Sequence, residues 1–176
     1  PDLTDRLGWL EAPAHTLRDL SKIMSLTEEI KRDGYEDVAL LGMGGSSLAP
    51  EVFMKTFGNK DGYPKLTVFD STDPDEIRRK EREINLGKTL FIVSSKSGTT
   101  LETISLYKYF FELKKGSAGD FIAITDKGSS LEKEATEKGF RRIFNAPSDV
   151  GGRYSALTFF GMVPAALIGV DIEKIL

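Results

Sequence analysis

The sequence predicts a three-layer α/β/α domain in which a five-stranded parallel sheet lies between helices. Five short runs of almost uninterrupted apolar residues alternate with segments of helical spacing, which is typical of parallel strands covered on both faces. The chain has 176 residues, of which 40% are hydrophobic, enough for one substantial core. The expected strands are residues 38–41, 66–69, 90–93, 121–125 and 142–144.

Helices are predicted before and between these strands. Leu17, Leu20, Ile23 and Ile30 recur at helical spacing, so one amphipathic helix is expected over residues 14–32. The later helices are expected at residues 50–57, 74–84, 101–114 and 130–138. Their ends carry capping signals, namely Asp73 before Pro74, the capping boxes Thr99-x-x-Glu102 and Ser129-x-x-Glu132, and the terminating glycines Gly116 and Gly139.

Residues 155–169 form a helix-like run that is apolar on nearly every face, so it is expected to be buried on all sides. Residues 171–176 resemble the start of another helix. We therefore expect a longer natural protein, with a further domain or subunit covering the apolar run. The predicted division is an N-terminal helical extension (1–35), a ligand-binding domain (36–148) and the start of a C-terminal part (149–176).

Composition excludes several function classes. The formal net charge of -3 and the scattered lysines and arginines do not fit a nucleic-acid-binding surface. Without cysteine, and with His15 as its one histidine, the chain offers no disulfide, thiolate or probable zinc site. The longest apolar stretch is too short for a membrane span and contains Pro164, so no membrane association and a cytoplasmic location are expected. The first residue is Pro1, not methionine, which suggests processing or an excised piece.

The first candidate ligand loop is Gly42-Met43-Gly44-Gly45-Ser46-Ser47, between a predicted strand and a helix. Such a turn directs backbone N–H groups and a helix dipole at one point, where an anion is favoured. Two other interpretations remain open. The glycines can serve a tight turn alone, or they can belong to a dinucleotide site with Asp70 on the ribose, although Ser47 replaces the third glycine of that motif. The Gly-Lys-Ser/Thr ending of the P-loop motif is absent from this loop.

The second candidate loop, Ser94-Ser95-Lys96-Ser97-Gly98-Thr99-Thr100, follows the third predicted strand. Its hydroxyl groups, the close backbone approach allowed by Gly98 and the charge of Lys96 favour an anion, with phosphate as the leading ligand. The alternative is a helix cap with solvated neighbours. A third segment, Gly151-Gly152-Arg153-Tyr154-Ser155, places an arginine at a glycine turn, where Arg153 is either a surface residue or a group that stabilises oxyanion charge. His15 is interpreted as a surface residue.

These three segments, in this order and spacing, resemble the phosphoglucose isomerase family over about residues 38–167. The resemblance implies a sugar isomerase (SIS) domain with a flavodoxin- or Rossmann-like sheet. It implies interconversion of glucose 6-phosphate and fructose 6-phosphate, without metal or organic cofactor, in a protein expected to be a homodimer. Leu7-Gly8-Trp9-Leu10 is more similar to the isomerase half of transaldolase–isomerase fusions.

The resemblance also implies roles for individual residues. Arg153 would steady the enediolate, and the substrate phosphate would be held by Gly45, Ser46, Ser95, Lys96, Ser97, Gly98, Thr99 and Thr100. Ser47, Ala49 and Gly98 depart from residues common in the family. The glutamate base and the ring-opening histidine and lysine of the family come from later sequence, so this chain alone is expected to bind a phosphosugar without isomerising it. The alternative is a non-catalytic SIS module that senses a phosphosugar.

Overall fold

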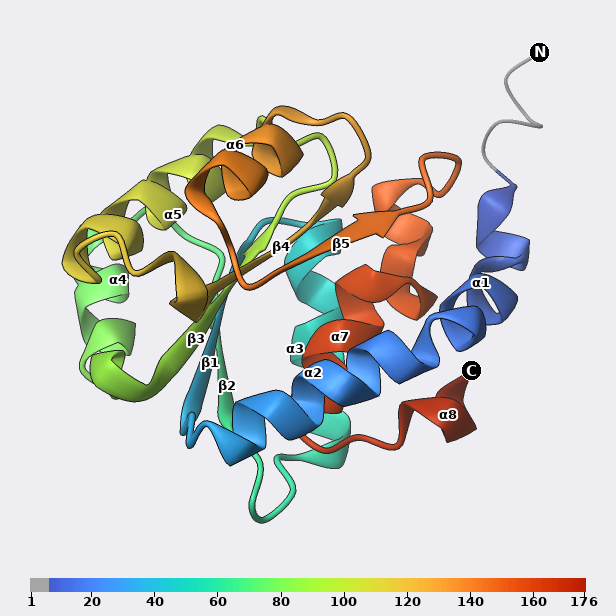
Figure 1. Cartoon of the computed structure of the whole chain (residues 1–176), viewed down its shortest axis with the longest axis horizontal. Helices are drawn as coiled ribbons and strands as arrows, with labels where there is room; N and C mark the ends of the chain where they lie inside the picture. The colour runs from blue at the N-terminus through green and yellow to red at the C-terminus, as the bar shows by residue number, and fades with distance from the viewer. Residues whose placement is uncertain (1–6) are drawn as a thin grey trace.

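Five parallel strands form one sheet in the order β2-β1-β3-β4-β5 (Figure 1). The computed structural model describes residues 7–176, so the first six residues of the predicted N-terminal extension lie outside the described part. The five-stranded parallel sheet is confirmed, and each strand is one or two residues longer than its apolar run. The strands are β1 (Asp37–Gly42), β2 (Lys65–Phe69), β3 (Thr89–Ser94), β4 (Phe121–Asp126) and β5 (Arg142–Ala146).

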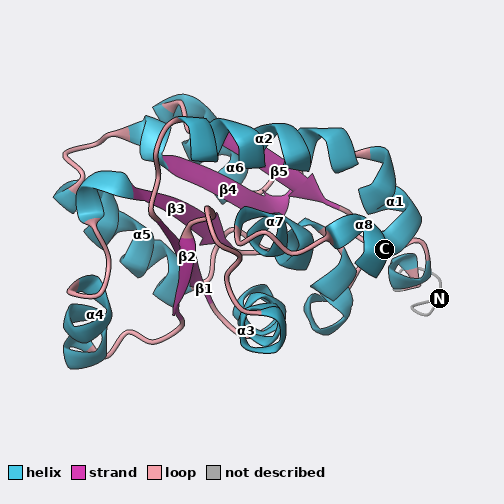
Figure 2. Ribbon diagram, turned by 90° about the horizontal axis from the view of Figure 1, so that it is seen from below, coloured by secondary structure: helices cyan, strands magenta, loops and turns pink. Residues whose placement is uncertain are grey.

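The strand order decides which helices cover which face. Parallel strands are joined by right-handed crossovers, so the face that a crossover helix covers depends on the direction of travel along the sheet. From β1 to β2 the chain moves one way, and in every later step it moves the other way. Helix α3 (Gly45–Phe57) therefore lies on one face, and α4 (Pro74–Glu81), α5 (Leu101–Leu113) and α6 (Ser130–Lys138) lie on the other (Figures 1 and 2).

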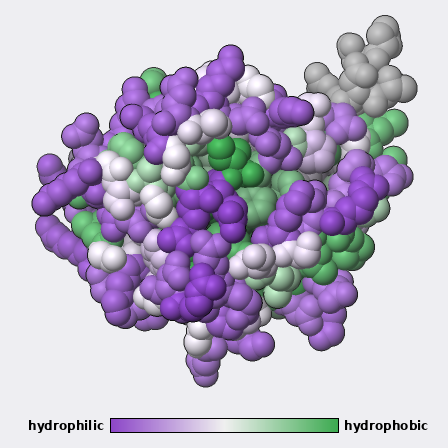
Figure 3. Space-filling view, in the orientation of Figure 1, coloured by the Kyte–Doolittle hydropathy of each residue, from purple (hydrophilic) through white to green (hydrophobic). Residues whose placement is uncertain are grey.

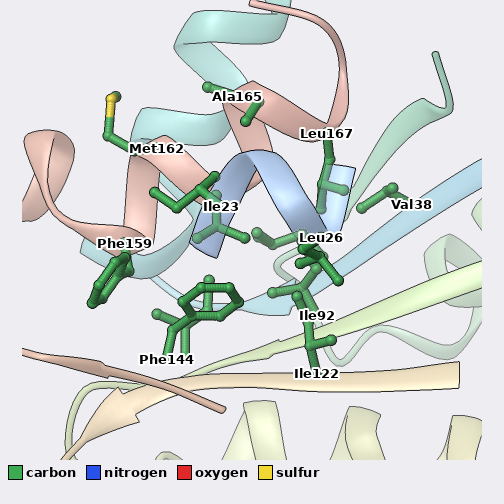
Figure 4. Packing of buried hydrophobic residues seen from close by; sticks show 14 of the residues in the cluster. Ile23, Leu26, Val38, Ile92, Ile122, Phe144, Phe159, Met162, Ala165 and Leu167 are labelled. Carbon is green, nitrogen blue, oxygen red and sulfur yellow. The ribbon is translucent and has the colours of Figure 1, made fainter. Parts of the chain in front are cut away.

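The face of α3 is completed by helices from the two ends of the chain, α2 (Leu20–Arg32) and α7 (Phe159–Leu167). All nine residues of α7 are buried within this chain. The expectation that another domain or subunit covers this apolar helix was therefore wrong: α7 is itself part of the cover over the sheet. Figure 4 shows Ile23 and Leu26 of α2 and Leu167 of α7 close to strand residues such as Ile92. The predicted division at residues 35 and 148 remains a prediction, although both flanking segments contribute to this core.

Alternate strand residues enter two separate apolar layers. Val38 and Leu40 of β1 face α2 and α7, whereas Ala39 and Leu41 face the side of α5 and α6. The second layer is rich in aromatic rings, including Phe91 stacked on Phe121 with their centroids 4.9 Å apart. On the face shown in Figure 3, hydrophilic side chains predominate, and smaller hydrophobic areas lie near its centre and along one side.

Several helix boundaries differ from prediction, and α4 also ends at Glu81, three residues before its predicted end. The first predicted helix is divided at Asp19 into α1 (Ala12–Arg18) and α2. Helix α3 begins at Gly45, five residues before the predicted start, and contains Pro50 in its second turn. The apolar run 155–169 begins as a 3₁₀ helix, η5 (Gly152–Leu157), before α7. Shorter helical elements are η2 (Gly8–Leu10), η3 (Leu86–Lys88), η4 (Ala118–Asp120) and α8 (Ile172–Ile175).

The capping predictions at Asp73, Ser129 and Gly139 hold, and the one at Thr99 does not. The Ser129 hydroxyl accepts a hydrogen bond from the Glu132 amide at the start of α6. The Asp73 carboxylate accepts hydrogen bonds from the first-turn amides of α4, and Gly139 ends α6 in the left-handed conformation. Thr99 does not cap α5; the N-cap residue is Thr100, whose hydroxyl bonds to Ser95. Within the described residues, no helix is both long enough and apolar enough to cross a membrane.

At the amino ends of β4 and β5, a polar cluster ties the end of α2 to the sheet. The Tyr35 hydroxyl donates to Asp120 Oδ1 over 2.6 Å, and Lys114 Nζ lies 2.9 Å from Asp120 Oδ2. Arg141 donates to Tyr35 over 3.0 Å and to Glu29 over 2.6 Å. Burial alone raises the pKa of Asp120, but the hydrogen bonds from Tyr35 and Lys114 outweigh it and lower the pKa overall. Burial and Asp120 raise the pKa of Tyr35 to about 12.

The pH dependence of stability in an Asp120 variant tests how much this cluster contributes to the folded state. Because the folded-state pKa of Asp120 is lowered, its stabilisation is present above the ordinary aspartate pKa and is lost as the pH falls through the folded value. Asp120→Asn should reduce the free energy of unfolding by about 1–2 kcal/mol at pH 7, and the difference should shrink below about pH 4. Urea unfolding across this pH range measures it. Asp61→Asn, at an exposed turn, is the control, and an equal, pH-independent loss in both variants would contradict the account.

Candidate functional site

The two predicted loops meet in one hollow at the carboxyl ends of the strands. The hollow lies at β1 and β3, where the strand order reverses, which is where ligands of such sheets bind. Of the predicted site residues, the structure brings five to its wall, together with three others. The lining residues are Met43, Gly45, Ser46, Lys96, Ser97, Thr100, Asp126 and Gly152.

Strand register places the loops side by side. Gly42, the last residue of β1, pairs with Ser94, the last residue of β3. A Cβ atom on Gly42 would lie 3.0 Å from the Ser94 carbonyl oxygen, so a larger residue would push the two strand ends apart. The Ser94 hydroxyl donates to the Ser46 carbonyl over 3.2 Å. Pro50 has no N–H to bond that carbonyl within the helix, so the proline leaves free an acceptor that Ser94 uses.

The first loop also contacts the third segment through backbone atoms. Gly44 has φ of 54° and ψ of -121°, a conformation that favours glycine, and turns the chain into α3. A Cβ atom on Gly45 would lie 2.2 Å from the Gly152 carbonyl oxygen. The Ser155 hydroxyl donates to this same Gly152 oxygen over 2.7 Å. Gly45 therefore lets the segment Gly151–Ser155 close against the start of α3.

In the second loop, Ser95 and Gly98 determine the backbone shape and do not line the hollow. The buried Ser95 hydroxyl accepts a hydrogen bond from the Gly98 amide over 3.2 Å and bonds to the Thr100 hydroxyl over 3.0 Å. Gly98 has φ of +71°, and a Cβ there would lie 2.9 Å from the Leu131 amide nitrogen at the start of α6. Gly98 departs from the residues common in the family that the chain resembles. The structure gives a local reason for the glycine, because α6 leaves no room for a side chain.

Backbone donors at the start of α5 remain available to a ligand. Among residues 7–176, no hydrogen bond engages the amide of Ser97 or Thr100. Thr100 is the N-cap of a 13-residue helix and makes no side-chain cap bond, so the positive end of the helix dipole lies at the hollow. The Thr99 amide and hydroxyl both bond to Ser97 Oγ instead. This arrangement favours an anion.

The cation of the site is Lys96, and it is paired. Its Nζ lies 2.6 Å from Asp126 Oδ2 and donates to the Ser148 carbonyl over 3.2 Å. Asp126 was not predicted as a site residue, because the apolar run of its strand ends at Thr125. The available signal was its position: a carboxylate immediately after a strand points to the same edge of the sheet as both loops.

Arg153 lies beside the hollow but does not line it. It is exposed on η5, whereas its neighbour Gly152 is at the wall. His15 is exposed and bonds through Nδ1 to Arg18 over 2.6 Å, in agreement with its interpretation as a surface residue.

The family model for phosphoglucose isomerase matches residues 16–176, nearly the whole described chain. The chain belongs to the phosphoglucose isomerase family. Curated relatives include a glucose-6-phosphate isomerase of Prochlorococcus marinus, 39% identical over 91% of this chain and 33% of that protein. Another, from Thermus thermophilus, is 31% identical over 97% of this chain and 41% of that protein.

Solved structures agree with this family membership. A hypothetical protein of Thermus thermophilus matches with a TM-score of 0.82 at 30% identity, covering 96% of this chain and 41% of that one. A glucose-6-phosphate isomerase of Chlamydia trachomatis matches with a TM-score of 0.76 at 28% identity, covering 91% and 31%. The NanR protein of Vibrio vulnificus, at 16% identity and a TM-score of 0.55, shares the fold alone. The chain spans about a third to two fifths of the length of the first two curated phosphoglucose isomerase relatives.

The contact between Gly45 and Gly152 yields a prediction. Gly45→Ala should force the Gly151–Ser155 segment away from α3, because the added methyl group would meet a backbone oxygen. The free energy of unfolding should fall by about 1–3 kcal/mol, as for other overpacked sites. Thermal and urea unfolding measure this loss. Gly119→Ala, where an added Cβ meets nothing within 4 Å, is the control, and equal stability of the two variants would contradict the predicted clash.

Proposed function

We propose that this chain is the phosphate-holding part of a glucose-6-phosphate isomerase. The observation that carries the proposal is the convergence of Gly45, Ser46, Lys96, Ser97 and Thr100 on one hollow. A phosphate there would accept hydrogen bonds from the Ser97 and Thr100 amides, from hydroxyl groups and from the Lys96 ammonium. Family membership supports a hexose phosphate as the ligand.

In this proposal Ser95, Gly98 and Thr99 serve the phosphate indirectly. The Ser95 hydroxyl fixes the loop through the Gly98 amide and Thr100. Thr99 bonds to Ser97 Oγ and so orients a hydroxyl near the ligand. The loop would be formed before the ligand arrives, which lowers the entropy cost of binding.

The proposed reaction is proton transfer between C1 and C2 of the open-chain sugar through an enediolate. Arg153, next to the hollow wall, would turn toward the developing negative charge and stabilise it. The glutamate base, and the groups that open the sugar ring, would come from outside residues 1–176. General bases and acids each contribute about 10²–10⁴-fold, so this chain alone should bind substrate without measurable turnover. The homodimer that the resemblance implies stays a prediction about the whole protein.

Phosphate-loop variants test the binding role. Lys96→Ala and Thr100→Val should each weaken fructose 6-phosphate binding, Lys96→Ala by about 10-fold or more because a charge-assisted hydrogen bond is lost. Isothermal titration calorimetry on the 176-residue chain measures the dissociation constants. Lys127→Ala, at an exposed turn outside the lining, is the matched control. Unchanged affinity in both loop variants, with wild-type binding intact, would refute the assignment.

Arg153→Ala tests the catalytic role in an active protein that contains this chain. Because the proposed charge appears in the transition state, kcat should fall by about 10²-fold or more while KM changes little. A coupled isomerase assay gives both constants. A change in KM alone would show that Arg153 merely holds substrate.

The same assay separates the enzyme from a non-catalytic phosphosugar sensor. Turnover by the containing protein, with none by the 176-residue chain, supports the isomerase. Binding without turnover in both would favour the sensor. A thermal shift with NAD or NADP, and none with fructose 6-phosphate, would instead support the dinucleotide interpretation of the first loop.

A further inference from the structure

The ion pair between Lys96 and Asp126 differs from a surface pair in how it is built. Both side chains are about three-quarters buried, with 25% and 23% exposed. An ammonium group has three N–H donors. The Lys96 ammonium group uses two of its N–H donors within the protein. One bonds to Asp126 Oδ2 over 2.6 Å, and one bonds to the Ser148 carbonyl over 3.2 Å. One donor is therefore left at the wall of the hollow.

The backbone holds the two residues together as well. The Asp126 amide donates to the Lys96 carbonyl over 3.0 Å, and the Thr125 hydroxyl donates to the same oxygen over 3.3 Å. The other carboxylate oxygen of Asp126, Oδ1, is buried and has no hydrogen-bond partner among the described residues. Leaving a buried charged oxygen without a donor is costly. Among the described residues, the hydrogen bonding of the carboxylate is thus confined to Oδ2 and Lys96.

We propose that Asp126 is a positioning residue, which holds the Lys96 ammonium so that its remaining N–H bond points into the hollow. This inference rests on the proposed phosphate site. Lysine has a long flexible side chain and loses much rotational freedom when it binds a ligand. The contacts with Asp126 and Ser148 impose that loss before the phosphate arrives, so binding is tighter than for a free lysine.

A different role for Asp126 predicts the opposite effect on phosphate affinity when Asp126 is removed. If the carboxylate only competed with phosphate for Lys96, or repelled it, then removing Asp126 would tighten binding. If Asp126 positions Lys96, removing it weakens binding even though a like charge has been deleted. Lys96 and Asp126 should also be coupled, because Asp126 acts through Lys96.

The experiment measures dissociation constants for inorganic phosphate and fructose 6-phosphate by calorimetry, on wild type and on Lys96→Ala, Asp126→Ala, Asp126→Asn and the double alanine variant. Asp126→Ala should weaken binding by about 3- to 10-fold, the cost of immobilising one long side chain. Asp126→Asn, which keeps an acceptor without the charge, should restore binding to within about 3-fold of wild type. The double variant should bind as weakly as Lys96→Ala.

Each other outcome has a definite meaning. Unchanged or tighter binding in Asp126→Ala, or additive effects in the double variant, would overturn the positioning role. Failure of wild type to bind either compound would overturn the proposed function itself. Thermal unfolding checks each variant, and if Asp126→Ala does not fold, Asp126→Glu takes its place. It keeps the charge but moves the oxygen by one methylene, so it must weaken binding if position matters.

Discussion

The close approach of the carboxyl ends of β1 and β3 is the constraint on which the site depends. Their pairing brings Gly42 opposite Ser94, and Gly42 has no room for a side chain there. From this point the two loops diverge into helices on opposite faces of the sheet, α3 on one and α5 on the other. A hollow between the loops follows from this divergence. The hydrogen bond from Ser94 to the carbonyl left free by Pro50 joins the end of β3 to the first turn of α3.

The proposed binding of an anion by this acidic chain must depend on groups close to the hollow. With a net charge of -3, the molecule has no overall field that would draw a phosphate. At the hollow, the charge of Lys96 is already balanced by Asp126. What remains is a set of oriented amide donors at the start of α5 and one ammonium N–H bond, and such preorganised donors act at short range. We therefore expect selectivity for a group of the right shape over anions in general.

The sequence predicted those features that depend on local pattern. All five strands followed from apolar runs, because a strand buried on both faces must be apolar throughout. The meeting of the two loops followed from the parallel sheet. The start of α3 was missed because Pro50 resembles a first-turn proline, and only the contact with Ser94 shows how it is accommodated within the helix. Asp126 was missed because its role depends on a side chain from a different loop, Lys96. The N-cap of α5 was missed because the hydroxyl groups of Ser95 and Thr100 bond to each other across the turn of their own loop.

The error about α7 shows how sheet topology governs burial. A helix that is apolar on all faces must be covered, and sequence alone does not say by what. The order β2-β1-β3-β4-β5 sends three of the four crossover helices to one face. Helix α3 cannot cover the other face alone, so α2 and α7 must complete it. Because α7 follows directly after η5, the packing that buries the sheet also presses Gly152 against Gly45. The site and the core are therefore built by the same segment, and a change that loosens α7 should open the hollow as well.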